Sequence, residues 1–224
     1  MIAQNMNVLQ STAAAAERVF EFLGEEEEVA ECAHPVEIFD VQGNTSIQGQ
    51  VTFENVHFGY TLDKIIIHDF SMYIKPGKKI AIVGPTGAGK TTIIKLLMRF
   101  YELNSGAIYI DGIKTTDMRR KDLRSLFGMV LQDAWLFNGT VMENLRYGKL
   151  DATDEEVIRA ADAAYVDHFI RTLDHGYDTV INEESSNISQ GQKQLLTIAR
   201  AFLADPKILI PDEATSSVDT RTEV

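Results

Sequence analysis

Residues 84–92 read GPTGAGKTT and match the pattern G-x-x-x-x-G-K-[ST], with Gly84, Gly89, Lys90 and Thr91 at its fixed positions. The apolar run before the motif predicts a strand, and the apolar residues after it, at helical spacing, predict a helix. A strand-to-helix turn is the setting in which this pattern forms a phosphate-binding loop. The plain alternative, a glycine-rich turn with a solvated lysine, leaves that setting unexplained.

Each residue type in this loop suits an anionic ligand. The glycines let the backbone bend so that successive N–H groups face a phosphate, and the following helix presents its N-terminus to the same charge. Lys90 can reach the β- and γ-phosphates, and Thr91 supplies a hydroxyl of the kind that ligates magnesium. We therefore expect ATP and Mg²⁺ as cofactors, bound by Gly84, Pro85, Thr86, Gly87, Ala88, Gly89, Lys90, Thr91 and Thr92.

A second set of candidate residues lies near the end of the chain, in the segment KILIPDEATS. A short apolar run there precedes Asp212 and Glu213, so a strand would deliver both carboxylates to the edge of a sheet. We expect Asp212 to face the magnesium and Glu213 to orient or deprotonate the water that attacks the γ-phosphate. Taken alone, an Asp-Glu pair is usually surface charge.

Periodicity elsewhere in the chain predicts alternating strands and helices, and hence an α/β fold. Strands are expected at 51–58, 70–74, 80–83, 107–110, 128–131 and 207–210. Helices are expected at 7–23, ending at Gly24, at 153–173, at 190–204, and from Lys90 onward with Ile93, Ile94, Leu97 and Phe100 on one face. Between the first helix and the first strand, an acidic run and scattered Pro and Gly residues indicate a linker.

Bulk properties exclude some classes of protein. A net charge of -12 among 224 residues argues against a nucleic-acid-binding surface, which needs clustered Lys and Arg. Cys32 is the only cysteine, so no internal disulfide can form, and a reducing, cytoplasmic compartment is the simplest interpretation. No apolar run approaches the roughly 20 residues needed to cross a bilayer, so any membrane-spanning part must be supplied by other segments.

Between the two halves of the expected site stands NISQGQKQLLTIARAFLADPKIL, and this order of motifs resembles the ABC ATPases. In that family the signature LSGGQ opens a helix that leads to the strand before the acidic pair. The corresponding residues here are Ile188, Ser189, Gln190, Gly191 and Gln192. The resemblance covers roughly residues 7–223, and the segments AERVFEFL and FNGTVMENLRYG are similar to those of exporters.

The resemblance implies an architecture and an activity. The fold would be a P-loop NTPase core with an antiparallel β subdomain and an inserted α-helical signature subdomain at about residues 134–204. Residues 51–224 would form the ATP-binding domain, residues 25–50 a linker, and residues 1–24 a helix continuing from a transmembrane domain. The activity would be ATP hydrolysis that drives export across a membrane, at its cytoplasmic face.

The family also assigns roles to further residues. Tyr60 matches the aromatic that stacks on adenine, although a lone tyrosine at a strand end is more often a packing residue. Gln132 matches the glutamine that ligates magnesium, senses the γ-phosphate and meets the transmembrane partner. The resemblance therefore gives Glu213, Lys90 and Gln132 as catalytic, Thr91, Gln132 and Asp212 as metal ligands, and Tyr60, Gln132, Ser189, Gly191, Gln192 and Asp219 as additional nucleotide-binding residues.

In the family, two ATP-binding domains pack head to tail, and the signature of each meets the nucleotide bound to the other. By this resemblance Ser189 and Gly191 would contact the partner's γ-phosphate, where a helix N-terminus favours the anion. Without the family, Ser189 is simply a helix N-cap. The expected partners are a second ABC ATP-binding domain and a permease domain. A heterodimer is slightly favoured, because Gln190 replaces a glycine as in one half of heterodimeric exporters.

The chain departs from the family pattern in two further places. Pro211 stands before Asp212, where proline removes a backbone donor, and this predicts a misplaced Asp212 and weakened turnover unless the strand has already ended. The sequence also stops at Val224, before the family's next strand and its switch histidine, so we expect an opened sheet with exposed apolar surface. The alternative function is therefore a truncated ATP-binding fragment with little or no turnover.

Overall fold

The computed structural model describes residues 2–61, 63–85, 87–131, 135–182 and 188–211, and the chain divides into two units, Met1–Glu31 and Cys32–Val224. The first unit holds helix α1 (Ile2–Leu23), which confirms the helix expected there. It ends where the N–H of Gly24 donates to the carbonyl oxygen of Phe20 at 2.9 Å. Among the described residues, no helix is both long enough and apolar enough to cross a membrane.

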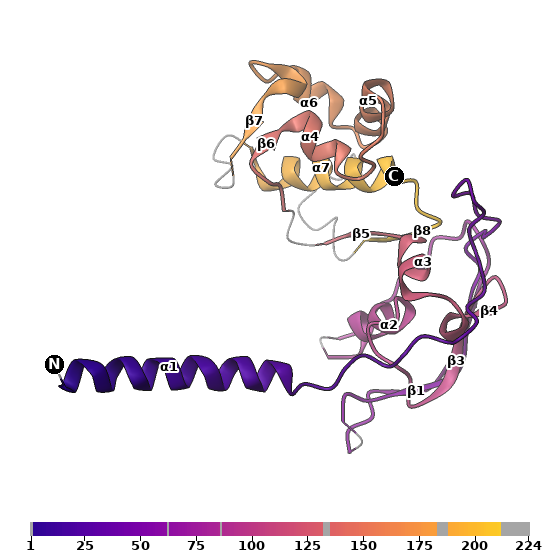
Figure 1. Ribbon diagram of the computed structural model, residues 1–224. Coiled ribbons are helices and arrows are strands. Elements are labelled where there is room, and N and C mark those ends of the chain that lie inside the picture. The colour runs from indigo at the N-terminus through magenta and orange to yellow at the C-terminus, as the bar shows by residue number, and fades with distance from the viewer. Residues whose placement is uncertain (1, 62, 86, 132–134, 183–187, 212–224) are drawn as a thin grey trace. The chain divides into compact units, whose positions relative to one another are not determined.

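The second unit begins with an antiparallel sheet of four strands in the order β2-β1-β3-β4 (Figure 1). Strand β1 (Val51–Phe58) pairs with β2 (Ile67–Ile74) on one side and with β3 (Ser105–Ile110) on the other, and β4 (Ile113–Lys114) extends the sheet beyond β3. The alternating apolar residues of β1 and β3 face a buried core. The expected antiparallel β subdomain is confirmed.

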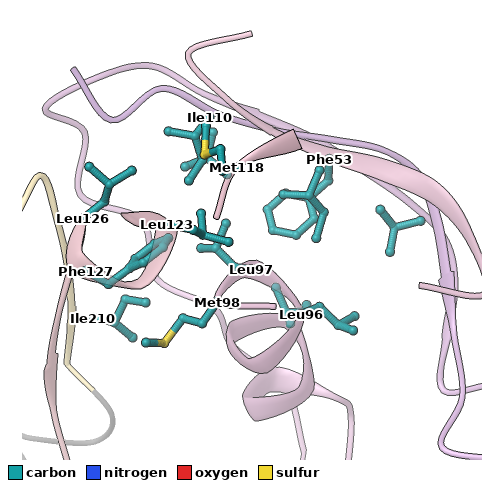
Figure 2. Packing of buried hydrophobic residues seen from close by; sticks show 14 of the residues in the cluster. Phe53, Leu96, Leu97, Met98, Ile110, Met118, Leu123, Leu126, Phe127 and Ile210 are labelled. Atoms are coloured by element: carbon teal, nitrogen blue, oxygen red, sulfur yellow. The ribbon is translucent and has the colours of Figure 1, made fainter. Parts of the chain in front are cut away.

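The core under this sheet is closed by two helices and a separate pair of strands. Helix α2 (Lys90–Leu97) follows the phosphate-loop motif, and after the 3-10 turn η1 (Thr115–Asp117), helix α3 (Arg120–Ser125) leads into β5 (Phe127–Val130). Strand β5 pairs in parallel with β8 (Ile208–Pro211). Figure 2 shows how these elements meet, with apolar side chains converging from α2, α3, β5, β8 and the sheet: Phe53, Leu97, Ile110, Leu123, Phe127 and Ile210.

Two expectations about this core are wrong. Residues 80–83 form no strand, and Ile80, Ile82 and Val83 are exposed, because no strand among the described residues lies beside them to pair with their backbone. An open cavity of about 520 Å³ lies instead between this segment, α2 and β8. The helix from Lys90 ends at Leu97, so Phe100 is not on its apolar face and is 48% exposed.

A second core lies among the helices that follow. These are α4 (Val141–Arg146), α5 (Asp154–Ala163), α6 (Asp167–Arg171) and α7 (Gln190–Leu203), with the short strands β6 (Gly139–Thr140) and β7 (Val180–Ile181) and the 3-10 turn η2 (Gly176–Asp178). Figure 1 shows the other helices gathered along α7. The group corresponds to the expected helical insertion between strands β5 and β8.

The single helix expected over residues 153–173 is wrong in one respect. The chain breaks after α5, where Tyr165 adopts a left-handed backbone conformation with φ 58°. The N–H of Val166 then donates to the carbonyl oxygen of Ala161 at 2.9 Å. This turn brings Val166 and Ile170 into the second core, where both are fully buried, and a straight helix would not do so.

The expected linker is packed against the domain in its later part. The N–H of Val36 donates to the carbonyl oxygen of Asp117 at 2.7 Å, and Ile38 and Ile47 are buried in the first core. The Asp111 carboxylate accepts hydrogen bonds from the backbone N–H groups of Gln48 and Gln50. From residue 36 onward, this segment is therefore part of the folded domain.

Candidate functional site

The phosphate-loop motif forms a turn that only glycine accommodates at its end. Gly87 and Gly89 have left-handed backbone angles, φ 84° and 87°. A Cβ atom on Gly89 would lie 2.8 Å from the Cδ1 atom of Ile67 in β2, so the end of that side chain would have to shift. Gly89 is the residue before α2, whose first-turn N–H groups have no partner within the helix. The loop and helix together present backbone donors of the kind that bind phosphate.

Lys90 extends across this loop. Its Nζ atom donates to the carbonyl oxygen of Gly84 at 2.7 Å and to that of Pro85 at 3.1 Å. The N–H of Ala88 donates to the carbonyl oxygen of Pro85 at 3.1 Å and closes the turn from the other side. The ammonium group is therefore held at the loop by two neutral acceptors, which phosphate oxygens can replace.

Thr91 and Thr92 differ in their surroundings. Thr91 is exposed and lines the 520 Å³ cavity together with Lys90, so its hydroxyl would be available to hold a magnesium ion. Thr92 is 6% exposed, and its Oγ1 atom lies 3.2 Å from the hydroxyl oxygen of Tyr60. The Thr91 hydroxyl and the neighbouring Lys90 ammonium are therefore the groups that a nucleotide with bound magnesium requires.

The same cavity is lined by the end of β8. Ile210 and Pro211 line it together with Lys90. Pro211 is the register partner of Val130, the last residue of β5. The carboxyl ends of two parallel strands thus lie side by side, and the chain continues from them toward Gln132 and Asp212. Five expected site residues lie outside the described residues: Thr86, Gln132, Asp212, Glu213 and Asp219.

Tyr60 lies just beyond β1 and is 47% exposed. Its ring contacts those of Phe58 and Tyr101 edge to face, with centroid separations of 5.1 Å in both pairs. The residue is therefore a packing residue on one side, as the plain alternative predicts, while about half of it remains open to a ligand. Nothing in the sequence pattern singles out Tyr101, because an aromatic residue beyond a helix gives no local signal of its neighbours.

The signature residues cap helix α7. The Ser189 hydroxyl oxygen accepts a hydrogen bond from the N–H of Gln192 at 3.3 Å, and the Gln192 side chain accepts one from the N–H of Ser189 at 2.9 Å. This reciprocal pair is a capping box. Ser189 and Gln190 are exposed, whereas Ile188 belongs to the second core and Ile93 of α2 to the first. The signature and the phosphate loop therefore belong to different packing groups.

Electrostatic effects in the helical group are local. Burial lowers the pKa of Arg200, whose guanidinium donates to the carbonyl oxygen of Asn144 at 2.8 Å and lies over the ring of Tyr147. Hydrogen bonds from the backbone and hydroxyl of Thr140 lower the pKa of Glu143, which forms a second capping box at α4. Both pKa shifts therefore arise from contacts that stabilise the helices, between α7 and α4 and at the start of α4.

Comparisons with known proteins agree with this geometry. The family described as "ABC transporter" matches residues 67–216. The "Fatty acid ABC transporter ATP-binding/permease protein" of Mycobacterium bovis is 52% identical over 223 residues, which are 100% of this chain and 34% of that protein. The mitochondrial "Iron-sulfur clusters transporter atm1" of Aspergillus fumigatus is 49% identical over 175 residues, which are 78% of this chain and 24% of that protein.

A solved structure is also similar. It is titled "Structure of a bacterial Atm1-family ABC exporter with ATP bound", and it matches 96% of this chain and 36% of its own chain, with a TM-score of 0.81 and 40% identity. The chain thus spans between 24% and 36% of the length of these relatives. The α/β fold with an antiparallel sheet and a helical signature region is confirmed, and the chain belongs to the ABC transporter family.

Proposed function

We propose that this chain is the ATP-binding and ATP-hydrolysing part of an ABC exporter and that it binds ATP together with Mg²⁺. One observation carries the proposal. Lys90 and Thr91, from the phosphate-loop motif, line the same cavity as Pro211, which directly precedes Asp212 and Glu213. Residues 120 positions apart in the sequence are thus brought to one place by α2 and β8.

The chain's own residues divide the work of the reaction. The loop N–H groups and α2 bind the phosphates, and the Lys90 ammonium exchanges the carbonyl oxygens of Gly84 and Pro85 for phosphate oxygens. Glu213 orients the attacking water and accepts its proton. Thr91, Asp212 and Gln132 would hold the magnesium, which when bound neutralises charge on the phosphates.

A head-to-tail dimer would complete the site. Ser189 and Gln190 are exposed at the N-terminus of α7, a helix of 14 residues, and so are available to a second nucleotide-binding domain. A helix N-terminus stabilises an anion placed there, so the partner's γ-phosphate is the expected ligand. Gln190 in place of glycine favours a partner that differs from this chain.

A permease domain is the second proposed partner. Two exposed aromatic residues lie after Gln132 in the sequence: Trp135 is 60% exposed and Tyr147 is 59% exposed. Both line a cavity of about 350 Å³, together with Arg200. Clustered exposed aromatics mark interaction surfaces. The Mycobacterium bovis relative is named as an ATP-binding/permease protein, which supports a location at the cytoplasmic face of a membrane. Two similar relatives are named for different cargoes, fatty acid and iron-sulfur clusters, so this shared part does not define the cargo.

A second candidate function is ATP binding with little turnover. Pro211 is part of β8 as its last residue, where it cannot donate a backbone hydrogen bond, and it is the residue that sets the path to Asp212. A shift at this position would displace both carboxylates while leaving the phosphate loop intact.

Phosphate release tests both candidates. The chain is assayed with ATP, with and without Mg²⁺, alone and with an exporter ATP-binding domain as partner, and Glu213→Gln is the control. Magnesium-dependent turnover that Glu213→Gln abolishes supports the proposal. Tight ATP binding without turnover selects the second candidate, and the absence of nucleotide binding contradicts both.

A further inference from the structure

Three aromatic rings form a closed cluster beside the phosphate-loop helix. Phe58, Tyr60 and Tyr101 lie with centroid separations of 5.1 Å for the first pair, 5.7 Å for Phe58 and Tyr101, and 5.1 Å for Tyr60 and Tyr101. Phe58 is only 3% exposed, whereas Tyr60 and Tyr101 are 47% and 42% exposed. Each ring therefore contacts the other two, and the two tyrosines form the outer part of the cluster.

The ring of Tyr60 is fixed at three points. Phe58 and Tyr101 contact it nearly at right angles, with interplanar angles of 82° and 83°. Its hydroxyl oxygen lies 3.2 Å from the Oγ1 atom of Thr92 in α2. Without Tyr101, the ring of Tyr60 would keep only Phe58 as an aromatic neighbour in this cluster. It could then tilt about its side-chain bonds.

Tyr101 is itself connected to α2. It follows the helix by four residues, and the Nζ atom of Lys95 lies 5.9 Å from the centroid of its ring. The ring that contacts Tyr60 thus lies just beyond the helix that follows the phosphate loop. Stacking on a base requires a ring whose tilt is set before the ligand arrives, since ordering it on binding lowers affinity.

We infer that Tyr101 is a positioning residue for nucleobase recognition, holding the ring of Tyr60 at the angle at which adenine stacks on it. The inference rests on the proposed function, because it requires that Tyr60 meets the base of a bound nucleotide. It assigns Tyr101 to the base-binding part of the affinity and not to the phosphate-binding part, which Lys90 and the loop supply.

The test compares two ligands that share a phosphate chain. ATP and inorganic tripolyphosphate, each with Mg²⁺, are titrated into the full chain by calorimetry. An edge-to-face aromatic contact contributes enough to change affinity about threefold to tenfold. Tyr101→Leu is expected to weaken ATP binding by that factor and to leave tripolyphosphate binding unchanged, while Tyr101→Phe, which keeps the ring, restores ATP binding.

Phe100 supplies a matched control. It is adjacent in sequence and similarly exposed at 48%, but its ring lies under the guanidinium of Arg124, 4.7 Å from its centroid. Phe100→Leu should leave the affinities for both ligands unchanged. If Tyr101→Leu does not fold, Tyr101→Met fills the same space without a ring and gives the same comparison.

A double-variant cycle separates positioning from packing. In a Tyr60→Leu chain, Tyr101→Leu should have no further effect on ATP affinity, since there is no ring left to hold. Equal weakening of both ligands by Tyr101→Leu, or an unchanged ATP affinity, would overturn the inference. A chain that binds neither ligand before any substitution would contradict the proposed function itself.

Discussion

Val130 and Pro211 are register partners at the carboxyl ends of the parallel strands β5 and β8. This pairing makes Pro211 the last residue of β8, so the alternative in which it lies just past the strand is wrong. Because proline has no N–H and its φ is fixed near -65°, it restricts the chain immediately before the two carboxylates expected to act in hydrolysis.

Replacing this proline should therefore act on the site more than on the strand. The N–H of Ile208 donates to the carbonyl oxygen of Leu126 beside β5, so the backbone nitrogen of residue 211 faces the other edge of β8, where no strand lies among the described residues, and Pro211→Leu should change the unfolding free energy in urea by less than about 0.5 kcal/mol. If the fixed φ of the proline displaces Asp212, magnesium-dependent phosphate release should rise about fivefold, the factor that about 1 kcal/mol gives in a rate. Pro76→Leu, in an exposed turn, is the control, and an unchanged turnover in Pro211→Leu would refute the displacement.

Lys90 is expected to matter for binding and very little for folding. Its ammonium donates to the carbonyl oxygens of Gly84 and Pro85, in an exposed loop. Lys90→Met should leave the unfolding free energy within about 0.5 kcal/mol of its original value. It should weaken ATP binding about 10- to 100-fold, because charge-assisted hydrogen bonds to phosphate are lost.

Lys95 gives the matched comparison for that measurement. It lies on the same helix, but its Nζ atom lies over the ring of Tyr101, 5.9 Å from the ring centroid. Lys95→Met should retain ATP affinity to within a small factor in calorimetric titration. Equal losses from both substitutions would mean that helix charge, and not the position of Lys90, governs nucleotide binding.

Ser189 has two roles that substitution can separate. Ser189→Ala removes the N-cap of α7 and should lower the unfolding free energy by about 1 kcal/mol. Ser189→Asp keeps an N-cap acceptor and should retain the stability, but its carboxylate would repel a phosphate bound to the partner domain. We therefore expect Ser189→Asp to abolish turnover of the paired domains while thermal unfolding stays unchanged. Full turnover in Ser189→Asp would leave Ser189 as a cap alone.

Much of this fold could be predicted from local patterns. The alternation in β1 and β3 and the apolar spacing in α7 are properties of each segment alone, and these elements appear where they were expected. The phosphate loop could also be predicted from the sequence. Gly87 and Gly89 adopt left-handed backbone angles that favour glycine, so the glycines of the motif mark the turn. Local chemistry was enough in these cases.

The errors arose where the outcome depended on a distant segment. Residues 80–83 have the composition of a buried strand, yet a strand forms only where another backbone lies beside it. The break at Tyr165 depends on the second core, which draws Val166 inward, and the helical pattern of residues 153–173 does not reveal it. The contact between Tyr60 and Tyr101 likewise joins two segments that are far apart in the sequence, one following β1 and the other following α2.

Tyr177 should make the domain sensitive to alkaline pH. Its hydroxyl donates to the carboxylate of Asp167 at 2.6 Å, and burial, followed by this hydrogen bond, raises the pKa of Tyr177 well above its usual value of about 10. In the unfolded chain the phenol ionises near pH 10, whereas in the folded chain it stays protonated to higher pH. The stabilisation is therefore complete below pH 10 and is lost as the pH rises above that value.

The variant Tyr177→Phe removes this titration. At neutral pH it should lower the unfolding free energy by about 1 kcal/mol, the contribution of one hydrogen bond. Between about pH 10 and 11.5 the unfolding free energy of the original chain should fall more steeply than that of the variant, so the two curves converge. Tyr165→Phe, at a tyrosine 72% exposed on the same group of helices, should keep the steep decline. Parallel curves for the original chain and Tyr177→Phe, measured by urea unfolding across this range, would show that the hydrogen bond to Asp167 does not hold the phenol in its protonated form.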